Sequence, residues 1–240
     1  MNSLRGGVDM KKYIAGFACV MAVSMTGCSL VGGGAFKKQV KKITETAEDV
    51  CDAEEASNKQ RKSILKNVSM KNVFEDGLYM TLDEDEISEM KYGLDSIDPD
   101  EIKSAFAFMK ADPSTDSSIV LMVLEVNDED MGEDIIDELS KIYGNIDSNL
   151  IKQYEDAGYE AAFGCEDDDG YYAAMLYING EAVDLASGAF VECNKKVITI
   201  VIYNGAGQTE LLGEFYDLMD DAGLADMEDL LKQKNKPKEK

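Results

Sequence analysis

The chain has 240 residues, with 24 Lys and Arg against 48 Asp and Glu, no His, no Trp and 5 Cys, for a formal net charge of −24. The absence of histidine excludes Ser-His-Asp and Cys-His sites and the H-E-x-x-H zinc helix. The negative charge argues against nucleic acid as a partner, because that affinity comes from Lys and Arg neutralising phosphates. At 45% apolar residues, the chain is nevertheless hydrophobic enough to bury a core.

The N-terminal segment has the pattern of a secretory signal. Lys11 and Lys12 precede an apolar run over 13–25, which ends in the small residues Thr26 and Gly27. A run of this length is too short for a stable transmembrane helix, which needs about 20 residues. We therefore assign residues 1–27 to a signal peptide and exclude them from fold reasoning. Met10 followed by two lysines resembles a start codon, and translation from it would leave residues 1–9 out of the protein.

Ser24-Met25-Thr26-Gly27-Cys28 resembles the lipobox of bacterial lipoproteins, with Met25 where the motif usually has Leu. In that family, the cysteine becomes the first residue and carries diacylglycerol on its sulfur. The resemblance implies that Cys28 is the lipidation site and that the protein is held on the outer face of the cell membrane. Two acyl chains anchor a protein stably, whereas one binds only marginally. The alternative is an ordinary signal peptide with an incidental cysteine.

Composition divides the mature chain into a tether, a body and a tail. Residues 28–36 read as a Gly-rich tether, 37–231 as an extracytoplasmic domain, and 232–240 as a basic disordered tail. Residues 45–231 carry 12 basic and 46 acidic side chains, a net charge of −34 between basic ends. The lysines next to the lipid either lie on anionic headgroups or are solvated ends of a domain kept soluble by its charge.

Helical signals dominate the first part of this domain. Apolar residues at three- and four-residue spacing predict an amphipathic helix over 37–66, interrupted near Ser57-Asn58. Thr81-x-x-Glu84 has the spacing of a capping box and predicts a short helix that ends at Gly93. Pro99 suits the first turn of another short helical segment.

Two similar units follow. Strands are expected over 104–110 and 118–126 with a helix over 130–143, and again over 188–193 and 197–203 with a helix over 208–222. A shift of 76 positions superposes the apolar residues of the two helices. We therefore predict an α+β fold with a largely antiparallel sheet, helices packed on one face, and two repeated hairpin-plus-helix units. The alternative is a chance alignment of amphipathic segments.

Between the units, two further strands are expected over 160–166 and 171–178, joined by a polar turn over 167–170. Asn179-Gly180 is typical of a two-residue hairpin turn. A run of neighbouring antiparallel strands from about 160 to 203 follows from this spacing.

Acidic clusters occur at 83–86, 128–130, 166–169 and 220–221. The third resembles a calcium loop, but Cys165 stands in its first position and Leu176 in its twelfth, where a bidentate Glu is required. Exposed hairpin carboxylates explain it better. Carboxylate pairs for glycoside hydrolysis stay open because acidic residues are so numerous. We assign no catalytic residue, no metal ligand and no cofactor.

Two weaker signals concern glycines and cysteines. Gly205-x-Gly207 follows an expected strand and precedes a helix, where backbone N–H groups can hold an anion, although a plain turn is the simpler interpretation. Cys165 and Cys193 fall in expected strands, so either they pair or, with Cys51, they are three buried thiols.

The segment 92–108, the strand 118–126 with its helix, and the strand pair 188–203 with its helix are similar to a family of uncharacterised Firmicute lipoproteins. Those proteins join a lipobox to a small α+β domain of unknown function, so the resemblance implies no activity. We expect a lipid-anchored binding or structural module for a cationic peptide, protein or cell-wall component. A carboxylate-based extracellular hydrolase and a calcium-stabilised surface domain are the alternatives, and the oligomeric state is open.

Overall fold

The structure is a computed structural model that describes residues 32–65, 76–89 and 94–232. The expected signal peptide, the first four residues of the tether with Cys28, the expected helix end at Gly93 and nearly all of the basic tail lie outside these residues. Within the described ranges, no helix is long and apolar enough to span a membrane.

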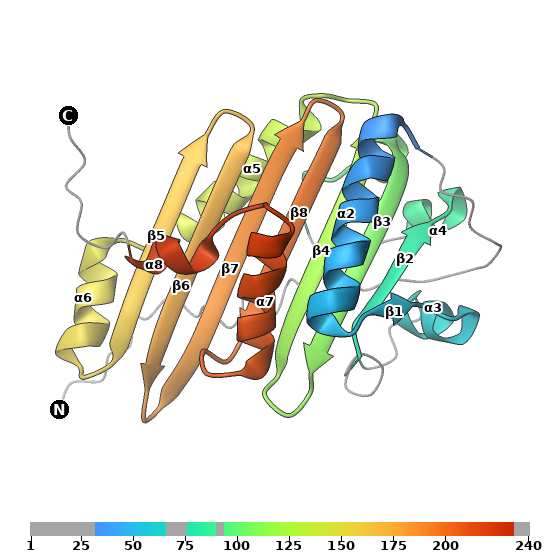
Figure 1. Ribbon diagram of the computed structural model, residues 1–240. Coiled ribbons are helices and arrows are strands. Elements are labelled where there is room, and N and C mark those ends of the chain that lie inside the picture. Colours follow the sequence, from blue (N-terminus) through green and yellow to red (C-terminus); the bar gives the residue numbers. More distant parts are fainter. Residues whose placement is uncertain (1–31, 66–75, 90–93, 233–240) are drawn as a thin grey trace.

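The described strands form one eight-stranded sheet in the order β1-β2-β3-β4-β8-β7-β6-β5 (Figure 1). All neighbours pair antiparallel except β1, which is parallel to β2. The strands are β1 (Glu54–Glu55), β2 (Leu78–Leu82), β3 (Ile102–Asp112), β4 (Ser117–Val126), β5 (Glu160–Asp168), β6 (Tyr171–Gly180), β7 (Val183–Asn194) and β8 (Val197–Gly205). The expected α+β class and largely antiparallel sheet are confirmed.

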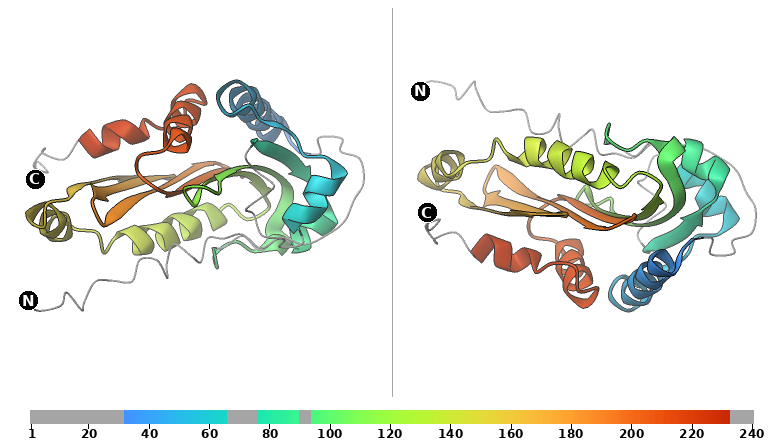
Figure 2. Two further views of the ribbon diagram at one scale, coloured as in Figure 1. Left: turned by 90° about the horizontal axis from the view of Figure 1, so that it is seen from below. Right: turned by 90° about the horizontal axis from the view of Figure 1, so that it is seen from above.

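Helices cover both faces of this sheet, as Figure 2 shows. One face packs against α2 (Gly34–Cys51), α7 (Glu210–Asp221) and α8 (Met227–Lys232), and the other against α5 (Met131–Tyr143) and α6 (Ser148–Asp156). Shorter helices, α3 (Asn58–Leu65), α4 (Glu84–Glu89) and the 3-10 turn η3 (Pro99–Glu101), lie toward the β1 and β2 edge. The prediction that the helices pack on one face is therefore wrong.

The central strand β4 explains why both faces need a cover. Ile119, Leu121 and Val123 pack into the core under α2 and α7, whereas Met122 and Leu124 face the core under α5. A strand buried on both faces reads as a continuous apolar run, whereas one with a solvated face alternates with polar residues. The run over 119–124 is continuous, so it indicates two covered faces.

The first helix is shorter than the expected span of 37–66. α2 ends at Cys51, and Asp52 then takes a left-handed conformation with φ 49°. Such a residue after the last helical turn ends a helix. The chain next forms β1, and the interruption expected near Ser57-Asn58 marks the start of α3.

Two hairpin turns were predicted from their turn residues, and the structure differs from both predictions. Asp168 pairs with Tyr171 around Asp169-Gly170, and Gly170 has φ 71°. A polar turn is therefore present at 169–170, whereas Asp167 and Asp168, which were expected in it, belong to β5. The Asn179-Gly180 turn is wrong, because Gly180 still pairs with Val183 and residues 181–182 form the turn. Gly180 instead makes room for Tyr159, whose ring would lie 2.4 Å from a Cβ there.

Both hairpin-plus-helix units exist, as β3-β4-α5 and β7-β8-α7. They differ in packing, because α5 and α7 lie on opposite faces of the sheet. The shift of 76 also lays Val197, the first residue of β8, on Leu121 in the middle of β4. The two units thus share an order of elements, and they are not equivalent repeats.

Candidate functional site

The N-terminal end of α2 is joined to the sheet by a buried carboxylate. Glu125 of β4 is 8% exposed; its Oε2 accepts the N–H of Gly33 at 2.8 Å and its Oε1 lies 3.1 Å from Nζ of Lys103. The first turn of α2 contains no acidic residue, and Gly33 has no side chain to cap it. Glu125 therefore supplies the negative charge that a helix N-terminus favours, and α2 begins at a fixed point of the sheet.

Opposing effects set the ionisation of Glu125. Burial by itself raises the pKa of this carboxyl group, but the Gly33 N–H and the Lys103 ammonium outweigh burial, so the pKa is lowered. The approach is close enough to require glycine, because a Cβ on Gly33 would lie 2.8 Å from Glu125 Oε1. Gly32, with φ 141°, similarly passes against the ring of Phe36.

Charge divides the exposed surface of α2 into two halves. The first half carries four exposed lysines and the second half three exposed acids: Lys37, Lys38, Lys41, Lys42, Glu45, Glu48 and Asp49. A helix is stabilised by acids near its N-terminus and by bases near its C-terminus. Here the order is reversed, so the helix dipole does not explain it; the described ion pair within α2 is between Lys41 and Glu45, at 3.6 Å.

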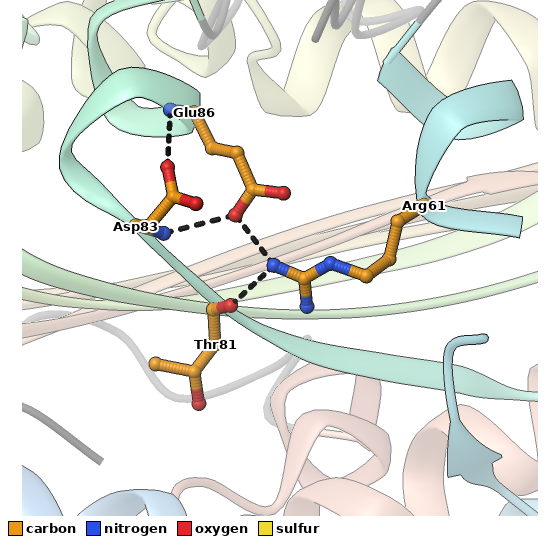
Figure 3. A network of polar contacts seen from close by, with 4 residues as sticks. All are labelled: Arg61, Thr81, Asp83 and Glu86. Carbon is orange, nitrogen blue, oxygen red and sulfur yellow. Dashed lines mark hydrogen bonds and ion pairs between the residues drawn. The ribbon is translucent and has the colours of Figure 1, made fainter. Parts of the chain in front are cut away.

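A buried ion pair joins α3 to β2 and α4 (Figure 3). The Arg61 guanidinium bonds to Oε2 of Glu86 and donates to the carbonyl of Thr81 at 2.9 Å. Glu86 Oε2 also accepts the N–H of Asp83, and Asp83 Oδ1 accepts the N–H of Glu86. This reciprocal pair is the capping box, so the box begins at Asp83 and the predicted Thr81-x-x-Glu84 box is wrong.

Glu86 bears on the hydrolase alternative because burial raises the pKa of its carboxyl group. The Asp83 N–H and the Arg61 charge act in the opposite direction without reversing the shift. A glycosidase needs a carboxylic acid with a raised pKa that faces a second carboxylate across the sugar. Glu86 instead faces a guanidinium and a helix end, and its side chain is 1% exposed. The geometry is that of a structural ion pair.

A second ionic contact joins α2, β3 and α7. Lys110 Nζ lies 2.8 and 2.7 Å from the two carboxylate oxygens of Glu214 and donates to the carbonyl of Cys51 at 3.1 Å. Burial, and next the Glu214 charge, raise the pKa of the Cys51 thiol to about 12. A thiol held in this protonated form is a poor nucleophile, so Cys51 is part of the core.

A buried polar chain links α5 to the sheet, and sequence reasoning missed it. The Tyr143 hydroxyl lies 2.9 Å from Ser187 Oγ, which donates to Asn204 Oδ1 at 2.9 Å. Burial raises the pKa of Tyr143 to about 12, so it stays a neutral hydrogen-bonding group. The chain satisfies polar atoms between α5, β7 and β8, as buried groups require.

The acidic clusters do not converge on a cation. The residues of the 166–169 cluster and the 220–221 cluster are exposed, Asp128 Oδ1 accepts the N–H of Asp130, and the 83–86 cluster holds Arg61. Across the described residues, no group of three or more Cys, Asp or Glu is placed to hold a metal ion. These clusters therefore cap helices or face solvent.

The glycine turn after β8 is filled by the protein itself. Gly207 donates its N–H to Asp184 Oδ1 at 2.7 Å, and Ala206 donates its N–H to Ser117 Oγ at 3.0 Å. Thr209 caps α7 by accepting the N–H of Leu212. The donors considered for an anion are thus used internally, as a plain strand-to-helix turn requires.

Cys165 and Cys193 lie in strands, as expected, but they are not joined. Register places Cys165 opposite Ala174 and Ala174 opposite Ala189, four residues from Cys193. Two strand spacings and four residues separate the Cα atoms by about 16 Å, well beyond the range of a disulfide. The alternative of three buried thiols is also wrong, because Cys165 is exposed and Cys193 is half-buried.

Cys28, the predicted lipidation site, lies outside the described residues, four positions before Gly32. The sequence matches no model of a known protein family, and no curated protein is detectably similar to it. No residue role is therefore transferred from another protein, and the function is argued from this chain.

Proposed function

We propose that this chain is a lipid-anchored extracytoplasmic module, attached to the outer face of the cell membrane through diacylglycerol on Cys28. The observation that carries the proposal is the lipobox-like run 24–28 after a basic and apolar leader. The likeness to Firmicute lipoproteins, which join such a run to an α+β domain, supports it. Gly33 and α2 follow directly and begin the folded domain, as a short tether needs.

The module acts by binding or by scaffolding, with a cationic peptide, protein or wall component as its partner. The acidic body, with a net charge of −34 over 45–231, attracts cations and repels nucleic acid. The buried residues Glu86 and Arg61 are paired with each other, so they favour a structural role over hydrolysis.

The anchor is tested by intact-protein mass spectrometry of the membrane fraction. We expect a wild-type mass of residues 28–240 plus diacylglycerol, and loss of that mass and of membrane retention in Cys28→Ala. Cys165→Ala is the matched control, because Cys165 is an exposed cysteine outside the lipobox-like run. An unmodified full-length chain in the cytosol would refute the anchor.

The partner class is tested by the binding of a fluorescent oligolysine peptide at low and high salt. We expect binding that weakens steeply with salt, whereas a neutral peptide of equal length does not bind. Equal binding of both peptides would refute an electrostatic partner.

A further inference from the structure

We infer that the first half of α2 and Lys103 form a docking surface for anionic phospholipid headgroups. We call this surface the basic corner and define it as Lys37, Lys38, Lys41 and Lys103. The inference rests on the proposed anchor and adds an orientation to it: the domain lies with α2 toward the bilayer.

The concentration of positive charge is the first argument. Residues 34–44 hold four lysines and no acid, in a chain with 48 acidic residues. Lys37, Lys38 and Lys41 are exposed, and Lys103 is 54% exposed where it meets Glu125. Lys42 differs from these three, because its Nζ lies against Gly223 at the end of α7, where a lysine can contact helix carbonyls.

The position of these lysines is the second argument. They stand at the end of α2 where the helix dipole disfavours positive charge, and the acids stand at the end where it disfavours negative charge. Stability therefore does not explain the order, whereas attraction to an anionic surface does. Lys37 and Asp49 are separated by about 18 Å along the helix axis, more than two Debye lengths of about 8 Å in physiological salt. Headgroups that contact Lys37 are thus screened from Asp49, whereas Glu45 Oε1 lies 3.6 Å from Lys41 Nζ and offsets part of that charge.

The short tether is the third argument. Four residues from Cys28 to Gly32 span at most about 14 Å, and Glu125 fixes Gly33 to β4. A diacylglycerol on Cys28 therefore holds the start of α2 within reach of the headgroups, where surface attraction acts.

Acids at the same end of the sheet decide how the domain tilts. Asp98 caps η3 just before β3, and Asp128 and Glu129 follow the end of β4. Among the described residues, Lys196 forms an ion pair with Glu129, at 3.9 Å. A domain that stood with this end of the sheet on the bilayer would bring these acids against the headgroups. Contact through the start of α2 lets the lysines reach the headgroups and leaves the α5 face toward solvent, whereas the exposed acids of α7 and α8 disfavour contact along the rest of the α2 face.

The test is amine acetylation of the full chain on vesicles, read out by peptide mass spectrometry. The chain is attached in two ways: through its native lipid, and through an N-terminal hexahistidine tag on a nickel-chelating lipid. We expect the four lysines of the basic corner, Lys103 included, to react about fivefold more slowly on phosphatidylglycerol vesicles than on phosphatidylcholine vesicles, the equivalent of one lysine's attraction to an anionic surface. Lys141 and Lys152, exposed on α5 and α6, should react equally on both.

A triple variant, Lys37→Gln with Lys38→Gln and Lys41→Gln, tests whether these lysines cause the protection on anionic vesicles. It should restore fast acetylation of Lys103 on anionic vesicles, whereas the control Lys141→Gln with Lys152→Gln should not. Because the lysines oppose the helix dipole, the triple variant should unfold at an equal or higher temperature. A lower unfolding temperature would identify the lysines as structural and overturn the inference.

The outcomes separate this inference from the anchor. Protection on the tagged vesicles without lipid on Cys28 in cells would support the basic corner and refute the anchor. Lipid on Cys28 with equal acetylation on anionic and neutral vesicles would support the anchor and overturn the basic corner. Equal slowing on both lipids would also overturn it, because tethering alone would then explain the protection.

Discussion

Removing Arg61 should destabilise the protein more than removing Arg61 and Glu86 together. In Arg61→Leu, Glu86 loses its cationic partner in a site where its side chain is 1% exposed. Breaking one side of a buried ion pair costs about 3–5 kcal/mol, whereas replacing both partners by apolar groups is often close to neutral. The double variant, in which an apolar residue also replaces Glu86, leaves the Thr81 carbonyl and the Asp83 N–H without these partners, at about 1 kcal/mol each.

The unfolding free energy lost in Arg61→Leu should become smaller as the pH falls. Burial raises the folded-state pKa of Glu86 from 4.5, so the folded protein binds the proton more tightly than the unfolded chain. The associated stability is fully present below pH 4.5 and is lost as pH rises through the folded-state pKa. Loss of Arg61 raises that pKa further. The cost of Arg61→Leu should therefore shrink on acidification, and the double variant should lack this dependence.

Urea unfolding followed by circular dichroism, at neutral and acidic pH, measures these costs. Hydrogen exchange provides a local reading, because the amides of Glu54 and Ala56 donate to carbonyls of Gly77 and Tyr79 beside α3. If α3 opens locally, these amides lose protection before the sheet does. The reasoning is refuted if Arg61→Leu costs no more than the double variant at neutral pH.

Three other predictions concern packing, charge and thiols. Gly164→Ala should detach α8, because a Cβ there would lie 2.0 Å from the Leu230 carbonyl oxygen. Gly213→Ala, where a Cβ would meet no atom within 4 Å, should instead stabilise α7 by about 1 kcal/mol. Unfolding midpoints and proteolysis near residue 224 compare the two variants. Glu125→Gln should cost about 1–3 kcal/mol of unfolding free energy at neutral pH. The cost should fall with pH, because the lowered pKa of Glu125 gives stability that is present above pH 4.5 and is lost on acidification through the folded-state pKa. Urea unfolding at several pH values measures this cost, and a cost that does not change with pH would contradict a role for the carboxylate. A thiol reagent should label Cys165 fastest, Cys193 slowly because burial raises its pKa to about 11, and Cys51 only on unfolding; rapid native labelling of Cys51 would contradict its burial.

Local patterns were sufficient to predict most elements of the fold. Period and turn residues located both hairpin-plus-helix units, and Pro99 indeed begins a short helical turn capped by Asp98. The layer arrangement was missed because apolar spacing identifies the buried side of a helix but not the face of the sheet that receives it. The continuous run in β4 carried that information. The alternation expected of a strand with one solvated face was absent from it.

The site residues were harder to predict because their partners are distant in sequence. Glu125 is 92 residues from Gly33, and Arg61 is 25 residues from Glu86. One local signal existed, since a lone acid inside the apolar run of β4 requires a partner when buried. The partner itself depends on strand pairing and on where α2 packs, which local periodicity does not encode.

The distribution of charge connects the anchor to the acidic body. Screening confines the attraction between lysines and headgroups to about a Debye length, so only lysines near the lipid can act. Lys37, Lys38 and Lys41 meet that condition through a short tether and a helix fixed by Glu125. The exposed acids of the β5–β6 hairpin lie four strands from β4, roughly 19 Å across the sheet. One domain can therefore present positive charge beside α2 and, across the sheet, negative charge at the β5–β6 hairpin.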